Sequence, residues 1–208
     1  MSKIILMNGA SSSGKALIAK GIQTLTSNLW LVFGADIFMS MIPYDKEEVY
    51  FSFIPGQNDY GPTARMGAMP EGMKLFGDIP DFVGFVADRG YDLIVDEILL
   101  GDALLKKYAH VLRHHTVYLV NVFCERKRLQ EREILRRDRR VGLANDQTDR
   151  IHEGLRVHCD LRVDTTHHSP FEVAAQILSY VQKNPHPQSF EVIRQGLTEE
   201  EKSLGISL

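Results

Sequence analysis

A glycine-rich loop near the start of the chain constrains its fold and its function more than any other stretch. The loop follows the apolar run of residues 4–7 directly. It fits the pattern G-x-x-x-x-G-K, which joins a buried strand to a helix and binds phosphate. Its residues are Gly9, Ala10, Ser11, Ser12, Ser13, Gly14 and Lys15.

The chemistry of such a loop explains its spacing. Glycines at both ends allow positive φ angles and a close approach of the backbone to a ligand. The N–H groups of the loop and of the following helix point into one concavity, where their dipoles attract an anion. Lys15 adds a positive charge that can reach the β- and γ-phosphates of a nucleotide. We therefore predict that residues 9–15 bind nucleotide phosphates; the alternative is a tight strand-to-helix turn that binds nothing.

The residue after the lysine departs from the motif. Ser or Thr is expected there, because its hydroxyl is a ligand of the Mg²⁺ that accompanies the nucleotide, and this chain has Ala16 instead. The phosphate cradle consists of backbone N–H groups and Lys15, so it is retained. We count Ala16 among the nucleotide-binding positions and expect the metal ligand elsewhere. A nucleotide-binding protein with weak or no catalysis is the alternative that this substitution keeps open.

Composition restricts the class of protein. Charged residues make up 25% and apolar residues 44% of the 208 residues, as in ordinary soluble domains, and the net charge of −3 argues against a dedicated nucleic-acid binder. Cys124 and Cys159 form neither a disulfide framework nor a metal-ligand pair. No apolar run reaches membrane-spanning length, and the chain starts with a predicted strand instead of a signal peptide. We therefore expect a cytoplasmic protein with no nucleic-acid or membrane partner.

Apolar runs alternate with helical patterns along residues 1–183, which we predict to be one domain. The predicted strands cover residues 4–7, 29–33, 91–97, 117–122 and 159–164, and the predicted helices cover 14–27, 37–39, 80–90, 101–113 and 169–183. This alternation predicts an α/β fold, with a five-stranded parallel sheet covered by helices on both faces and the site at its carboxyl edge. Residues 184–208 are expected to form a tail, a linker followed by a short surface helix over 198–204.

Two acids follow predicted strands at that edge. Asp36 comes after the second strand, and Asp96 lies at the end of the third, beside Glu97. Ligands of open α/β sheets bind at this edge, although Asp36 equally suits the N-cap of the next helix. Asp96 matches the acid that holds Mg²⁺ in nucleotide-hydrolysing P-loop proteins, and we predict it to be the metal ligand. A buried strand can also end on Asp without that role.

Residues 43–78 give the weakest pattern. A strand is expected over 49–54, and Met66, Met69 and Met73 accumulate here with several aromatic residues. Such adaptable apolar side chains suit a cavity for a small molecule. Ordinary packing under a long loop explains them at least as well.

The most charged stretch, residues 125–140, has acids every few residues among its arginines and lysines, which is typical of a solvated helix with i,i+4 pairs. The alternative is that one or two of the arginines close over the phosphates as a lid, predicted over about residues 125–145. An RNA-binding face is disfavoured, because the acids offset the charge and no aromatic residues interleave for stacking.

In this order and spacing, the chain resembles the chloramphenicol phosphotransferase family, small P-loop kinases that phosphorylate the 3-hydroxyl of the antibiotic with ATP. The resemblance covers about residues 3–183 and omits the tail. Besides the loop, the matching pieces are residues 33–36, 94–97, 100–101, 132–139, 152–154 and 163–167. The resemblance implies a P-loop nucleotide-kinase-like three-layer sandwich with a helical lid.

The resemblance also assigns roles. Asp36 would be the general base that takes the proton of the acceptor hydroxyl, and Lys15 would contact the transferred phosphoryl group. Arg132, Arg136 and Arg139 would belong to the lid over the phosphates. ATP and Mg²⁺ are the implied cofactors, a small-molecule hydroxyl compound the implied partner, and antibiotic resistance the implied role. A kinase for another hydroxyl metabolite, such as a sugar, a nucleoside or a coenzyme precursor, is the alternative, and a homo-oligomer is left open.

Overall fold

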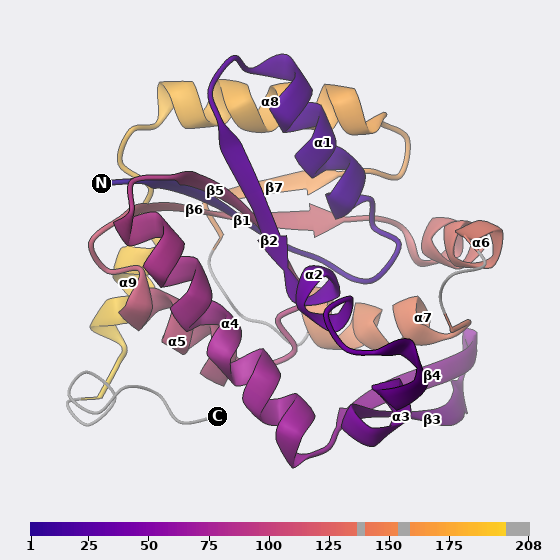
Figure 1. Ribbon diagram of the computed structural model, residues 1–208. Coiled ribbons are helices and arrows are strands. Elements are labelled where there is room, and N and C mark those ends of the chain that lie inside the picture. The colour runs from indigo at the N-terminus through magenta and orange to yellow at the C-terminus, as the bar shows by residue number, and fades with distance from the viewer. Residues whose placement is uncertain (137–139, 154–158, 199–208) are drawn as a thin grey trace.

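The computed structural model describes residues 1–136, 140–153 and 159–198. Its main sheet has five parallel strands in the order β2-β5-β1-β6-β7 (Figure 1). The strands are β1 (Lys3–Asn8), β2 (Trp30–Gly34), β5 (Asp92–Glu97), β6 (Thr116–Phe123) and β7 (Leu161–Asp164). The predicted five-stranded parallel sheet is confirmed.

Helices cover both faces of this sheet. One face is covered by α1 (Lys15–Leu25) and α8 (Pro170–Lys183), and the other by α4 (Pro70–Asp88), α5 (Asp102–Val111) and α9 (Ser189–Gln195) (Figure 1). The period-two alternation of a strand explains the two layers. In β1, Ile5 and Met7 pack with α1 and α8, whereas Ile4 and Leu6 pack with α4 and α5. The three-layer sandwich is confirmed.

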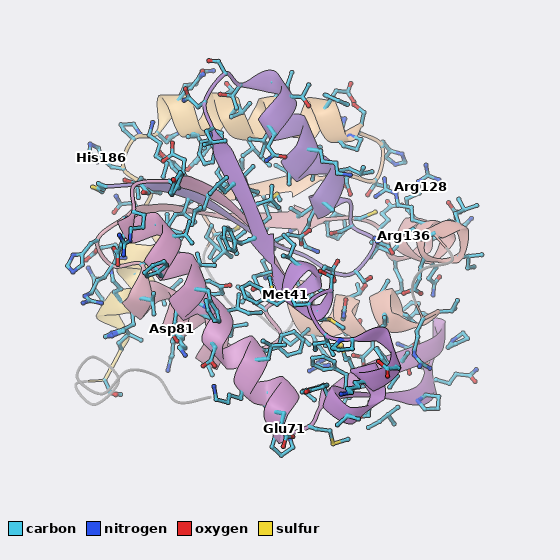
Figure 2. The ribbon with its side chains drawn as sticks, viewed as in Figure 1. Met41, Glu71, Asp81, Arg128, Arg136 and His186 are labelled. Atoms are coloured by element: carbon cyan, nitrogen blue, oxygen red, sulfur yellow. The ribbon has the colours of Figure 1, made fainter. Side chains whose placement is uncertain are left out.

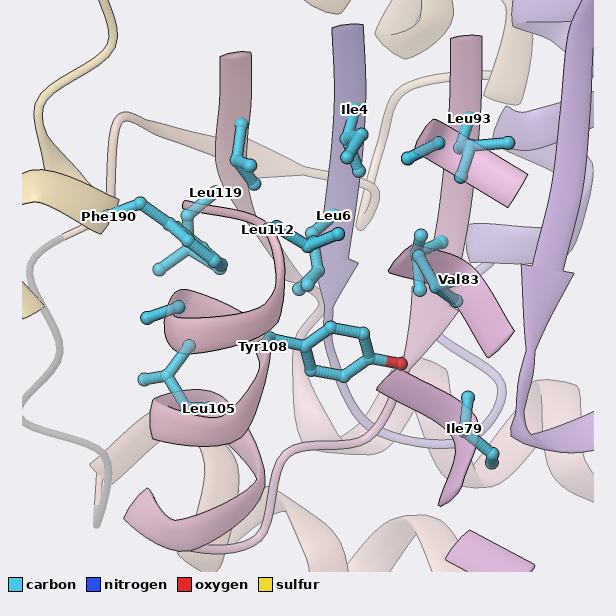
Figure 3. Close-up of a cluster of buried hydrophobic side chains, with 14 of the residues drawn as sticks. Ile4, Leu6, Ile79, Val83, Leu93, Leu105, Tyr108, Leu112, Leu119 and Phe190 are labelled. Carbon is cyan, nitrogen blue, oxygen red and sulfur yellow. The ribbon is translucent and has the colours of Figure 1, made fainter. Parts of the chain in front are cut away.

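The layer under α5 is built around Tyr108, which Figure 3 shows among side chains of β1, α4, β5, β6 and α9. One of them is Phe190 of α9, which is only 2% exposed. The linker expected before residue 198 is therefore wrong, because residues 189–195 form a helix that packs into the core. The helix expected over 198–204 lies almost wholly outside the described residues, and the domain boundary at residue 183 stays a prediction.

Residues 43–88 differ most from the prediction. After two short segments, η1 (Tyr44–Lys46) and α3 (Glu47–Tyr50), the strands β3 (Phe51–Asn58) and β4 (Gly61–Ala68) form a separate antiparallel hairpin. The strand expected over 49–54 is thus too short, because β3 continues through Pro55; both strands of a two-stranded sheet are edges, where proline is tolerated. The predicted helix start at Pro80 is also wrong. α4 begins at Pro70, and Pro80 lies inside it.

The remaining elements lie at the carboxyl edge of the sheet. They are α2 (Ala35–Met39), α6 (Arg126–Arg136), α7 (Leu143–Thr148) and the π-helical turn η2 (Asp149–Glu153). In Figure 1, α7 lies between the main sheet and the β3–β4 hairpin, while α6 lies on the outer side. α6 and α7 occupy most of the range predicted as a lid. None of the helices in the described part of the chain is long and apolar enough to cross a membrane.

Candidate active site

The phosphate loop connects β1 to α1 as the motif predicts. Gly9 has no room for a side chain, because an ideal Cβ there would lie 2.6 Å from the carbonyl oxygen of Val122. Gly14 has a φ of +96°, which favours glycine. Ser12 also has a positive φ, of 63°, and is the one described residue other than glycine to do so. These turns curl the backbone around the start of α1.

Lys15 is fixed at the mouth of this loop and is only 5% exposed. Its Nζ donates hydrogen bonds to the carbonyl oxygens of Gly9 at 2.8 Å and Ala10 at 3.2 Å. The same atom lies 3.3 Å from Oδ1 of Asp96. The ammonium therefore bridges the loop and the end of β5, where a phosphate would lie next to it.

The hydroxyls of Ser12 and Ser13 are buried and have no hydrogen-bond partner within the described residues. Buried polar groups in native proteins nearly always have one. A phosphoryl oxygen bound at the loop would provide an acceptor for the hydroxyl of Ser12. This observation fits a nucleotide.

A cavity of about 1410 Å³ opens in front of the loop. Five side chains singled out from the sequence line it: Lys15, Asp36, Asp96, Arg132 and Arg136. Among the loop residues, Ser11, Ser12, Gly14 and Ala16 also line it, whereas Gly9, Ala10 and Ser13 do not. Arg139 lies outside the described residues. The structure thus brings together most of the residues predicted for the site.

Asp36 and Asp96 lie at the ends of neighbouring strands. β2 pairs with β5 so that Gly34 is opposite Asp96, and an ideal Cβ on Gly34 would lie 2.2 Å from the carbonyl oxygen of Asp96. Glycine is therefore required for this approach. Asp36 is exposed towards the cavity and belongs to the first turn of α2, whose N-cap is Gly34. The alternative role of Asp36 as the N-cap is wrong.

Glu97 is a second acid at the end of β5, and the sequence pattern did not assign it a role. It lines the cavity but is only 2% exposed. The hydroxyl of Tyr108 donates a hydrogen bond to its Oε1 at 2.6 Å, and the N–H of Ile98 donates to Oε2 at 3.3 Å. Burial raises the pKa of Glu97 to about 7, with Asp96 adding to the rise and the two hydrogen bonds opposing it. The cavity floor therefore holds a carboxyl group that titrates near neutral pH.

α6 brings two arginines to the cavity in front of the loop. Arg132 and Arg136 are four residues apart and so share one face of the helix. Arg136, labelled in Figure 2, lies in the last turn of α6. Arg132 donates to the carbonyl oxygen of Thr165 at 2.6 Å and to its hydroxyl at 3.2 Å. That hydroxyl in turn donates to the carbonyl oxygen of Ser13 at 2.8 Å. Thr165, which follows β7, thus ties Arg132 to the phosphate loop, and no local sequence signal indicates this.

Two further arginines line the cavity and were not among the predicted site residues, Arg140 and Arg150. The guanidinium of Arg140 lies 4.5 Å from the ring centroid of Phe53 on β3, within the range of a cation–π contact. Arg150 pairs with Asp146 at 3.0 Å. The cationic side of the cavity therefore reaches the hairpin.

The far wall of the cavity is apolar. Its side chains come from the hairpin and the start of α4, and they are Phe53, Met66, Ala68, Met73 and Phe76. The predicted small-molecule cavity therefore receives Met66 and Met73, whereas Met69 does not line it. A phosphate site and an apolar wall share one cavity, which is the arrangement needed to bring a nucleotide and an organic acceptor together.

A family model described as chloramphenicol phosphotransferase-like protein matches residues 2–182 of the chain. A protein of Mycobacterium tuberculosis strain H37Rv, provisionally named an O-phosphotransferase, is 26% identical over 204 aligned residues. That alignment covers 92% of this chain and 88% of the relative.

Two solved kinases share the fold. An unliganded sugar kinase from Janibacter sp. HTCC2649 has a TM-score of 0.57 at 18% identity, covering 89% of this chain and 96% of that one. The Mycobacterium tuberculosis APS kinase CysC, solved with AMPPNP and APS, has a TM-score of 0.54 at 17% identity, covering 87% and 98%. At such identities the likeness shows the fold alone.

Proposed function

The chain belongs to the chloramphenicol phosphotransferase-like family, and from this premise we propose that it transfers the γ-phosphoryl group of ATP to a hydroxyl group of a small molecule. The observation that carries the proposal is the single cavity in which Lys15 and the loop, Asp36, and an apolar wall meet. In such chemistry the protein mainly positions the reactants and neutralises charge.

The nucleotide would be held by the loop. Backbone N–H groups of the loop and of the start of α1, with the ammonium of Lys15, would take the β- and γ-phosphates, and the buried hydroxyl of Ser12 would gain a partner. Arg132, already tied to the loop through Thr165, lies beside these phosphates, and Arg136 follows on the same helix face. Both guanidinium groups would stabilise the charge that spreads over the equatorial oxygens during transfer.

Asp96 fits one ligand of Mg²⁺, directly or through water, because its carboxylate lies at the cavity floor beside Lys15. The described residues contain no cluster of three or more His, Cys, Asp or Glu side chains that could hold a metal. A single carboxylate is compatible with Mg²⁺, because this ion usually keeps several waters and is bound by one or two carboxylates together with substrate phosphates. When bound there, the ion would neutralise charge on the phosphates.

Asp36 would orient the acceptor hydroxyl and take its proton. It lies one strand away from Asp96, on an exposed turn that faces the same cavity. The acceptor itself would rest on the apolar wall of Phe53, Met66 and Met73. This wall favours a hydroxyl compound with a sizeable apolar or aromatic part. Chloramphenicol is the first candidate by family, with a role in antibiotic resistance, and another hydroxyl metabolite is the alternative.

The test is a panel of hydroxyl compounds, chloramphenicol included, incubated with γ-labelled ATP, Mg²⁺ and the wild-type chain. We expect label on an apolar hydroxyl compound, and none with Lys15→Ala, which removes the charge at the loop. Calorimetric titration of both chains with ATP checks the nucleotide site separately. Equal ATP affinity for wild type and Lys15→Ala would refute the assignment of the loop.

A further inference from the structure

One backbone donor of the phosphate loop is already occupied by a distant side chain. The N–H of Ser11 donates a hydrogen bond of 2.7 Å to Oε1 of Gln147 on α7, across 136 residues of sequence. Gln147 is only 5% exposed, and both residues line the cavity. Loop N–H groups are the groups that phosphoryl oxygens of a nucleotide use. The carboxamide oxygen therefore takes one of the loop N–H donors that a phosphoryl oxygen could use.

The helix that carries Gln147 is fastened to the acceptor wall. Two residues earlier, Nδ2 of Asn145 donates to Oδ1 of Asn58 at 2.9 Å and to the carbonyl oxygens of Gly61 at 3.2 Å and Pro62 at 2.9 Å. All three acceptors lie at the tip of the β3–β4 hairpin. α7 and the hairpin that carries Phe53 and Met66 are thus joined by part-buried hydrogen bonds of the Asn145 side chain.

A backbone contact reinforces this junction. The N–H of Ala64 on β4 donates to the carbonyl oxygen of Gly142 at 3.0 Å. An ideal Cβ on Gly142 would lie 2.7 Å from the carbonyl carbon of Thr63. The backbone before α7 therefore packs directly against the backbone of β4. The start of α7 and strand β4 are therefore held together by main-chain contact as well.

The same helix start is held by α6. Glu133 is 1% exposed and accepts hydrogen bonds from the N–H groups of Gly142 at 2.7 Å and Ala144 at 2.8 Å. Glu133 is adjacent to Arg132, which reaches the phosphate loop through Thr165. α7 therefore joins the phosphate loop, the arginine helix and the acceptor wall.

We propose that Gln147 is a positioning residue that transmits occupancy of the phosphate loop to the acceptor wall. A phosphoryl oxygen of a nucleoside polyphosphate replaces Oε1 of Gln147 at the Ser11 N–H, α7 is released from the loop, and the hairpin moves with it. Nucleotide binding and the shape of the acceptor pocket are then coupled, and acceptor binding affects nucleotide affinity by the same factor. This inference rests on the proposed function and adds an order of events to it.

The direction in which one substitution changes nucleotide affinity distinguishes this role from direct phosphate binding and from a purely structural role. Gln147→Leu removes the competitor for the Ser11 N–H, so nucleotide affinity rises by about 2- to 10-fold, the worth of one neutral hydrogen bond. A residue that bound the phosphate directly would instead lose affinity when truncated, and a merely structural residue would lower affinity and stability together. Gln147→Glu keeps an acceptor for the N–H and adds a negative charge near the phosphates, so affinity falls.

The experiment is calorimetric titration with Mg²⁺ and either ADP or a non-hydrolysable ATP analogue. Wild type, Gln147→Leu, Gln147→Glu and Gln130→Leu are compared, after thermal melts show that each is folded. Gln130 is the matched control, because its Nε2 donates to the carbonyl oxygen of Tyr60 at 2.9 Å and so contacts the hairpin without touching the loop. We expect tighter binding for the Leu variant at 147, weaker binding for the Glu variant, and wild-type binding for the control.

Hydrogen–deuterium exchange of the wild type supplies a second readout. Saturating nucleotide changes the exchange of amides in residues 51–68, and in Gln147→Leu the hairpin exchanges alike with and without nucleotide. Unchanged hairpin exchange in the wild type, or equal or weaker nucleotide binding by Gln147→Leu, overturns the inference while leaving the proposed function standing. A wild-type chain that binds neither nucleotide overturns both.

Discussion

Asp36 and Asp96 show how similar side chains acquire different surroundings at one sheet edge. Asp96 ends a central strand and lies 3.3 Å from the ammonium of Lys15, whereas Asp36 lies on an exposed turn one strand further out. A carboxylate beside a fixed cation suits a metal or phosphate site. One that faces open cavity suits contact with an incoming hydroxyl.

The exposed position of Asp36 leads to the first prediction. Asp36→Asn keeps the size of the side chain but cannot take a proton, so kcat falls by about 10²–10⁴-fold while ATP affinity stays near wild type. The measurements are turnover on a confirmed acceptor and ATP titration. Asp45→Asn, an exposed acid in η1 outside the cavity, is the control and leaves turnover unchanged. Unchanged turnover in Asp36→Asn would leave the mechanism without its base.

Ala16 leads to the second prediction. It is exposed to the cavity directly after Lys15, so Ala16→Ser places a hydroxyl where the motif has its metal ligand. By analogy with the loss of supporting metal contacts, turnover rises by up to about 10–100-fold and needs less Mg²⁺. Ala16→Cys, of similar size but without the oxygen, stays slow. If the Ser variant is no faster at any Mg²⁺ concentration, other groups already hold the metal fully.

The buried carboxyl of Glu97 leads to a prediction on pH. Its folded-state pKa of about 7 lies above the ordinary value of 4.5, so between these values the folded state keeps a proton that the unfolded state has lost. The contribution of Glu97 to the free energy of unfolding is therefore fully present below about pH 4.5. It is lost as the pH rises through about 7, and the loss amounts to about 3 kcal/mol. Denaturant unfolding at about pH 5 and about pH 8, without metal or nucleotide, measures this loss. Glu97→Gln should reduce it; an identical pH dependence in both chains would contradict the prediction.

At the scale of helices and strands, the central elements could be predicted because both faces of their strands are buried. Ile4, Ile5, Leu6 and Met7 are all 0% exposed, and a continuous apolar run of this length is a clear strand signal. The β3–β4 hairpin gave a poor signal, because most of its residues are half-buried or exposed and Pro55 and Pro62 suggest breaks. α4 was cut short because Pro80 reads as a helix start, whereas here it is tolerated inside the helix.

The junction of α6 and α7 gives a prediction at this scale. Glu133→Gln leaves one carboxamide N–H₂ facing a backbone N–H, so one of the two buried hydrogen bonds to Gly142 and Ala144 is lost. The expected cost is about 1–3 kcal/mol, or about 2–10 °C in melting temperature. Glu131→Gln on the same helix is the control. Its exposed pair with Arg128 contributes little, so a melt lowered equally by both changes would contradict the assigned role.

Across the whole molecule, the parts of the site that the sequence could predict are those with a local pattern. The loop and the strand-end acids carry such patterns, and they line the same cavity. Gln147 does not, because its partner Ser11 lies 136 residues away. Thr165 falls within the matching piece 163–167, but its contact with Ser13, 152 residues away, has no local pattern. A role that depends on such distant contacts leaves no trace in spacing or periodicity.

The place of α9 yields a prediction for the whole chain. Phe190 is buried against the α5 layer, so Phe190→Ala should cost about 3–5 kcal/mol and lower the melting temperature by about 6–15 °C. Val192→Ala, at a side chain that is 51% exposed on the same helix, should melt near wild type. Comparison with a chain truncated after residue 183 tests the domain boundary. A truncated chain as stable as the full one would show that the tail is dispensable.

The hairpin and the main sheet share no strand pairing. The groups proposed for phosphoryl chemistry belong to the main sheet and its helices, whereas the hairpin supplies part of the apolar wall. Laboratory evolution of acceptor preference can therefore randomise residues 52–57 and 65–68 as a replaceable cassette, without changing the register that pairs Gly34 with Asp96. The hairpin must keep the tip residues that bind Asn145 and the strand edge that contacts Gly142. A transplanted hairpin without these residues would lose the hydrogen bonds that hold it against α7.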